Sequence, residues 1–164
     1  MQPASLSPQQ LRYLDSIIGM SEEELLYEIA REMLSGVTNS VRPDYEIKAG
    51  GPGQSKEERR EARRNAVPDK PVDEYVKPLL EPHLPEAKEK AQSILTKIHQ
   101  LLCDEKTQKP KEWALDIATG ETRNLVVIVA AQLAPQHIAT ITVILASVAW
   151  SLKGGLHLLC ATKV

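Results

Sequence analysis

The stretch that decides the fold reads NLVVIVAAQLAPQHIATITVILASVAWSL, from Asn124 to Leu152, and contains no charged residue. Because 26% of the whole chain is charged, a run this apolar must be hidden from water. About 20 apolar residues can span a bilayer, but Pro135, Gln136 and His137 interrupt the run near its middle. Each half fits a helix buried in a soluble core. The pattern therefore predicts a buried apolar helix pair near the C-terminus.

Length and composition fit one globular domain of 164 residues with an aliphatic core, since the chain contains no Phe. A net charge of -2 gives no global field that would attract nucleic acid or an anionic membrane. Two cysteines are too few for the disulfide framework of a small secreted domain, which favours reduced thiols. The first twenty residues lack the pattern of a secretory signal. We therefore expect a cytoplasmic protein.

The N-terminal region, 1–36, predicts a helical hairpin. Ser7 with Gln10, and Ser21 with Glu24, form two capping boxes, and apolar residues follow each box at helical spacing. Acidic residues outnumber basic ones in this region, so its outer face is expected to be acidic.

The middle region, 37–84, does not predict an independent domain. Residues 37–54 have no sustained period and end in a Gly-rich tract, which is typical of a flexible linker. Residues 55–66 favour a helix that is polar on every side. Five prolines then exclude a long helix between Val67 and Leu84 and predict an extended strap. The apolar residues available to place this strap on the core are Val72, Tyr75, Val76, Leu79 and Leu80.

The C-terminal region, 85–164, predicts the core helices. An amphipathic helix is expected over 85–104, followed by a loop at Lys106–Lys111 and a short helix that includes Trp113. Thr122 is placed to cap the first helix of the apolar pair. We predict an all-α compact bundle of four to six helices, in which the helices over 21–35 and 85–104 wrap the apolar pair.

One spacing resembles a metal site. His99 precedes Cys103 by four residues and His157 precedes Cys160 by three, so on helices each pair shares a face and the two pairs offer a Cys2His2 zinc set. The pairs lie far apart in sequence and lack a CxxC knuckle. We therefore favour structural, reduced core cysteines, and predict no metal and no cofactor.

The polar helix carries a cluster of basic residues: Lys56, Arg59, Arg60, Arg63 and Arg64. Such a cluster can contact phosphates, but three glutamates are interleaved with it and no aromatic residue lies within it to stack on bases. A solvated helix, or one that docks on a protein, is favoured over nucleic-acid binding. No nucleophile beside a base, paired carboxylate or phosphate-binding loop is visible, so we expect no enzymatic activity.

The C-terminal third resembles a group of small uncharacterised bacterial proteins. The resemblance rests on Leu102-Cys103-Asp104, the segment around Trp113, the two apolar helices and Gly155-Leu156-x-x-Leu159-Cys160. It implies a soluble all-helical domain and no particular activity.

The function that these patterns favour is protein–protein interaction, as a non-catalytic regulatory or adaptor subunit. The expected contact elements are the basic run and the acidic start of the second helix, at Glu22 and Glu23, because a helix without a core face gains stability from a partner. A membrane-active protein that inserts residues 124–152 as a helical hairpin is the alternative, and an unrecognised enzyme ranks third. The sequence specifies neither the partner nor an oligomeric state.

Overall fold

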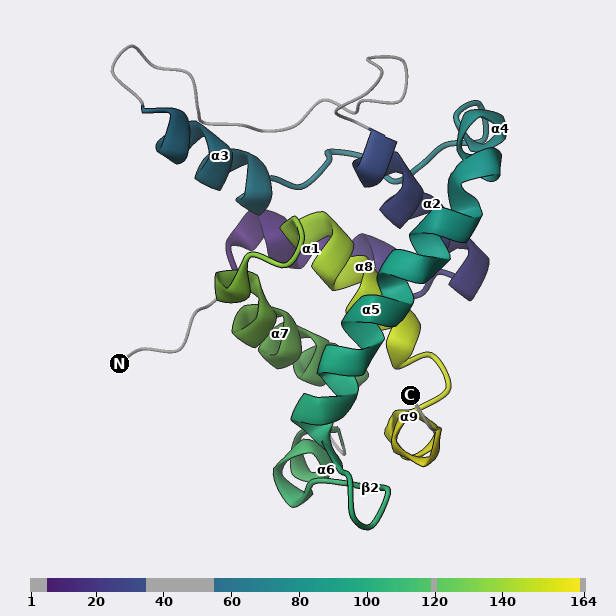
Figure 1. Cartoon of the computed structure of the whole chain (residues 1–164). Helices are drawn as coiled ribbons and strands as arrows, with labels where there is room; N and C mark the ends of the chain where they lie inside the picture. The colour runs from purple at the N-terminus through teal and green to yellow at the C-terminus, as the bar shows by residue number, and fades with distance from the viewer. Residues whose placement is uncertain (1–5, 35–54, 119–120, 163–164) are drawn as a thin grey trace.

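The computed structural model describes residues 6–34, 55–118 and 121–162, so the linker predicted at 37–54 lies outside the described residues. Nearly all regular structure in the described ranges is helical (Figure 1). The helices of ten or more residues are α1 (Pro8–Ile17), α2 (Glu22–Leu34), α3 (Lys56–Asn65), α5 (Leu84–Leu102), α7 (Thr122–Leu133) and α8 (Ile141–Ser151). The shorter ones are α4 (Lys77–Leu80), α6 (Glu112–Ala118) and α9 (Leu156–Ala161). The predicted all-α bundle is confirmed.

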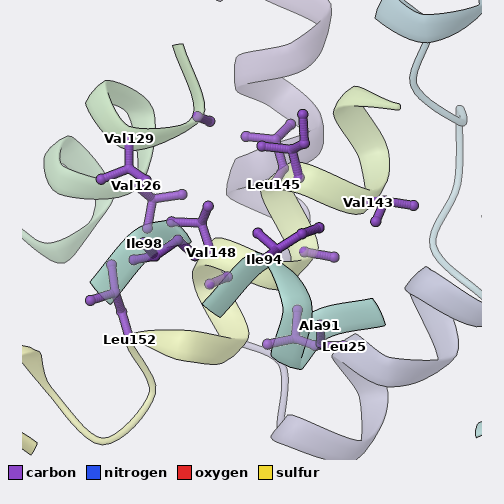
Figure 2. Packing of buried hydrophobic residues seen from close by; sticks show 14 of the residues in the cluster. Leu25, Ala91, Ile94, Ile98, Val126, Val129, Val143, Leu145, Val148 and Leu152 are labelled. Carbon is purple, nitrogen blue, oxygen red and sulfur yellow. The ribbon is translucent and has the colours of Figure 1, made fainter. Parts of the chain in front are cut away.

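The centre of the core is α8, which α2, α5 and α7 surround (Figure 1). Every residue from Ile141 to Ala149 is buried, as expected for a helix that is apolar on all sides. Figure 2 shows Ile94 and Ile98 of α5, Val126 of α7 and Val148 of α8 converging on one another. The predicted wrapping by α2 and α5 is confirmed for α8, whereas α7 packs mainly against α8 and α6.

The two halves of the apolar run are buried to different degrees. Whereas α8 is buried all round, α7 buries one face, made of Leu125, Val126, Val129, Ala130 and Leu133. The chain turns between them through the short 3-10 helix η3 (Ala134–Gln136), and His137 then adopts a left-handed conformation with φ of 54°. Among the described residues, none of the helices combines the length and apolar character needed to cross a bilayer.

The N-terminal hairpin is confirmed together with both capping boxes. The Ser7 amide donates to Gln10 Oε1 at 2.9 Å, and the Gln10 amide donates to Ser7 Oγ at 3.2 Å. The Ser21 amide likewise donates to Glu24 Oε1 at 3.3 Å, and the Glu24 amide donates to Ser21 Oγ at 3.2 Å. These reciprocal bonds satisfy amides that the first turn of each helix leaves unpaired.

The strap prediction is partly wrong. Residues 66–72 run without helix, but α4 and the 3-10 helix η2 (Glu81–His83) follow and lead directly into α5. Prolines are tolerated here because each occupies a first turn, where no intrahelical amide bond is lost. Leu80 is fully buried, whereas Tyr75 and Leu79 are 90% and 51% exposed and do not join the core as expected.

Two local predictions after α5 also need correction. The segment read as a loop forms a small antiparallel hairpin, in which β1 (Cys103–Asp104) pairs with β2 (Lys109–Pro110). Thr122 is the first residue of α7 and not its cap, because Glu121 holds that position and its side chain forms no capping bond. The short helix expected around Trp113 is confirmed as α6.

Candidate functional site

The predicted basic run forms α3, which lies at the edge of the molecule (Figure 1). The Glu58 amide donates to Ser55 Oγ at 3.1 Å and so caps the helix. None of its residues is buried, as its composition predicts. Glutamates in the first turn and arginines in the last complement the helix dipole, which adds a modest local stabilisation to α3.

Charges on α3 are segregated around the helix axis. Four cations fall within an arc of roughly 100°, since successive residues turn by about 100°. We call these four residues the basic face: Lys56, Arg59, Arg60 and Arg63. All four are exposed, and none of them forms an ion pair with another described residue. The three glutamates of α3 lie outside this arc, so the basic face is an open patch of positive charge.

Arg64 belongs to the basic run in the sequence but not to the basic face. Its Nη1 donates to His137 Nδ1 at 3.0 Å and lies 3.3 Å from Glu61 Oε2. A guanidinium nitrogen can only donate, so Nδ1 of His137 accepts and the ring proton lies on Nε2. Arg64 therefore fixes α3 to the turn between α7 and α8.

Two further hydrogen bonds hold the carboxyl end of α3. Gln10 Nε2 of α1 donates to the Asn65 carbonyl at 2.8 Å, and Thr142 Oγ1 of α8 donates to the Ala66 carbonyl at 3.3 Å. Thr142 is fully buried in a mainly apolar helix, and this bond satisfies its hydroxyl. Anchors at one end thus position α3 while its basic face stays exposed.

The predicted acidic contact residues lie elsewhere. Glu22 and Glu23 are exposed in the first turn of α2, and no ion pair of the described residues joins them to α3. Glu22 lines a hollow of about 160 Å³ together with Trp150 and Leu158. The structure therefore does not combine the acidic and basic elements into one site.

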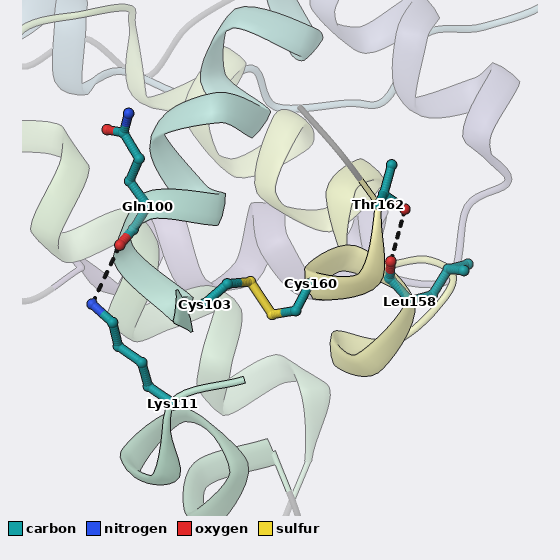
Figure 3. The surroundings of a disulfide bond; sticks show 6 residues. All are labelled: Gln100, Cys103, Lys111, Leu158, Cys160 and Thr162. Carbon is teal, nitrogen blue, oxygen red and sulfur yellow. Dashed lines mark hydrogen bonds between the residues drawn. A yellow bond between two sulfur atoms is a disulfide. The ribbon is translucent and has the colours of Figure 1, made fainter. Parts of the chain in front are cut away.

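The prediction of reduced cysteines is wrong, because Cys103 and Cys160 form a disulfide bond (Figure 3). The bond joins β1 to α9, and both residues are at most 1% exposed. It brings together residues 57 positions apart. With this disulfide, the cysteine content no longer indicates a reducing compartment.

The zinc set is also contradicted. The disulfide uses both sulfur atoms, so no thiolate remains to bind a metal. His157 is exposed on α9, while His99 is half-buried with its Nε2 unpaired. Within the described ranges, no group of three or more His, Cys, Asp or Glu residues is arranged to hold a metal ion.

A buried charged cluster was not predicted. Glu28 and Arg31 on α2 are 1% and 3% exposed, and their ion pair measures 2.7 Å. Tyr13 of α1 donates to Glu28 Oε1 at 2.8 Å, and the Val72 amide donates to Glu28 Oε2 at 2.6 Å. Arg31 Nη1 donates to the Lys70 carbonyl at 2.8 Å. The cluster fastens the strap after α3 onto the N-terminal hairpin.

Burial, together with the Glu28 carboxylate, raises the pKa of Tyr13 well above its ordinary value. The sequence signal for this cluster was an acidic and a basic residue three positions apart on α2. Such pairs usually lie on solvated faces, whereas here α1 and the strap both pack on the pair.

The chain matches no family model, no curated protein and no solved structure. The resemblance to small bacterial proteins therefore stays a prediction.

Proposed function

We propose that this chain is a non-catalytic binding protein whose basic face on α3 docks an acidic surface of a partner protein. The observation that carries the proposal is a helix with no buried residue, held by hydrogen bonds at its carboxyl end. An isolated ten-residue helix is marginal in water, so the anchors add the order that a preformed docking element needs.

The chemistry of the basic face favours carboxylates. Guanidinium groups donate paired hydrogen bonds that match a carboxylate, and three of the four cations are arginines. Because these side chains have no ion-pair partner among the described residues, docking would not require breaking such a pair. The groups themselves bind anions and are not nucleophiles at neutral pH.

A protein partner is favoured over nucleic acid. Three glutamates share α3 with the cations, and they would repel the closely spaced phosphates of a duplex. The helix also has no aromatic residue on which a base could stack. A protein surface can place a few carboxylates opposite the basic face without facing the glutamates.

The proposal is tested by co-purification under mild cross-linking from cells that express the protein. The wild type is compared with Arg59→Glu/Arg63→Glu, and with Lys88→Glu/Lys97→Glu on the exposed side of α5 as a control of equal charge change. We expect reversal of the basic face to reduce recovery of the specific partner by about tenfold, and the control to retain it. Recovery should also fall as salt is raised. Equal recovery with both variants would reject the proposal.

A further inference from the structure

A second feature beneath α3 is a hollow of about 650 Å³, within the range of roughly 300–1,000 Å³ that small-molecule sites occupy. It lies between the start of α1, α3, the end of α7 and the start of α8. Its apolar lining includes Leu6, Ala131, Ala134 and Ile141. This lining provides a surface for a hydrocarbon group.

Polar groups lie on the α3 side of the hollow and at the turn. Glu61, Asn65 and His137 line it, and Arg64 contacts two of these three residues. Since His137 accepts from Arg64 through Nδ1, its Nε2–H remains a donor. The lining also includes Ser7, whose amide donates to Gln10 and whose Oγ accepts from the Gln10 amide, so that its hydroxyl proton remains available. On the lining, the donors therefore include the His137 imidazole, the Asn65 side-chain amide and the Ser7 hydroxyl. Arg64 does not line the hollow, but its guanidinium contacts the lining residues Glu61 and His137.

The charges around these donors favour an anionic head group. Glu61 is the resident anion on Arg64, but the pair is 3.3 Å long and its side chains are 40% and 54% exposed. Such exposed pairs contribute little, so another carboxylate can replace Glu61 at low cost. The neighbouring basic face adds positive potential on the same helix.

We propose that this hollow binds a small apolar acid. Its carboxylate lies at His137, next to the Arg64 guanidinium that contacts this imidazole, and its hydrocarbon chain packs against Ala131, Ala134 and Ile141. Binding exchanges the weak Glu61 contact for a ligand carboxylate and removes apolar surface from water. None of the four residues of the basic face lines the hollow, so the ligand and the proposed partner would contact different residues.

The probe is decanoate, titrated into the full chain by calorimetry, with neutral 1-decanol as the comparison ligand. Ala131→Phe fills the hollow and is expected to weaken decanoate binding on the order of tenfold or more. Gln132→Phe, next to Ala131 on α7 but exposed and outside the lining, is the steric control and retains wild-type affinity. Arg64→Gln should reduce the preference for the acid over the alcohol. Decanoate binding that is absent, or unchanged by Ala131→Phe, overturns the proposal.

A measurement on the wild type tests the site even if a variant does not fold. Amide shifts in a nuclear magnetic resonance titration with decanoate should concentrate at Ala131, Ala134, His137 and Ile141. Shifts confined to the apolar hollow near Trp150 would place the ligand elsewhere and reject the assignment. Arg59→Glu/Arg63→Glu should lower decanoate affinity less than Arg64→Gln does, which separates failure of this site from failure of the docking surface.

Discussion

The helices α8 and α3 have nearly the same length, but α8 is buried and α3 is exposed to water. In α8 every residue from Ile141 to Ala149 is buried, whereas in α3 no residue is. Burial dictates where α8 lies, because its apolar side chains have no other stable environment. Hydrogen bonds at one end position α3, and its charges remain open for binding. One helix thus organises the fold, and the other is available for interaction.

The largest expected loss of stability comes from placing a charge in the buried helix α8. Ile144 is fully buried in α8, so Ile144→Asp places an unpaired carboxylate in an apolar interior. We expect a loss of several kcal/mol and unfolding at neutral pH, measured by circular dichroism. Gln92→Asp on the exposed side of α5 introduces the same group and should change the unfolding free energy by less than about 0.5 kcal/mol. A folded, cooperative Ile144→Asp protein would contradict the central place of α8.

The buried cluster between the hairpin and the strap should give the next largest effect. Glu28→Ala leaves Arg31 buried without its counter-ion, which costs about 3–5 kcal/mol. Glu23→Ala, at an exposed position of the same helix, should have little effect. Chemical denaturation measures both. If both variants lost equally little unfolding free energy, the cluster would not fasten the strap that follows α3.

The disulfide should contribute somewhat less to the unfolding free energy than the buried cluster does. Reduction of the Cys103–Cys160 bond is expected to lower the unfolding free energy by about 2–4 kcal/mol, because it releases a long loop in the unfolded chain. Cys103→Ala/Cys160→Ala should then be insensitive to reductant. Two free thiols per chain, titrated after denaturation of protein purified without reductant, would show that the bond does not form.

Ionisation of Tyr13 at alkaline pH should lower the unfolding free energy by a smaller amount. Its pKa is raised in the folded state above the unfolded value of about 10, so the stability from the neutral phenol is present below that pH. This stability is lost as the pH rises through the folded pKa, because the unfolded chain ionises first. Tyr13→Phe should cost about 1 kcal/mol at neutral pH and abolish this part of the alkaline loss. An unchanged alkaline slope in the variant, followed by denaturation at several pH values, would exclude Tyr13 as its source.

Hydrophobic pattern made the fold largely predictable. The uncharged run with its break at Pro135, the capping boxes of Ser7 and Ser21, and the absence of a core face on α3 all appear as predicted. These features depend on neighbours in sequence, where helical period and capping chemistry apply directly.

The errors concern contacts between distant segments. Pairing of Cys103 with Cys160 depends on how α9 packs against the end of α5, which spacing alone does not determine. The contact of Arg64 with His137 joins residues 73 positions apart and separates this arginine from the basic face. Composition could identify α3 as a candidate interaction element, but not the anchors that position it.

Native-state hydrogen exchange tests the contrast between α8 and α3 most directly, because one experiment reports on both helices. The amides of α8 from Ile144 to Val148 should exchange only through global unfolding, with the full unfolding free energy. The amides in the middle of α3 should exchange through local opening at a free energy well below that of α8, because no side chain of that helix is buried. Protection of α3 equal to that of α8 would contradict the account, since α3 would then belong to the cooperative core.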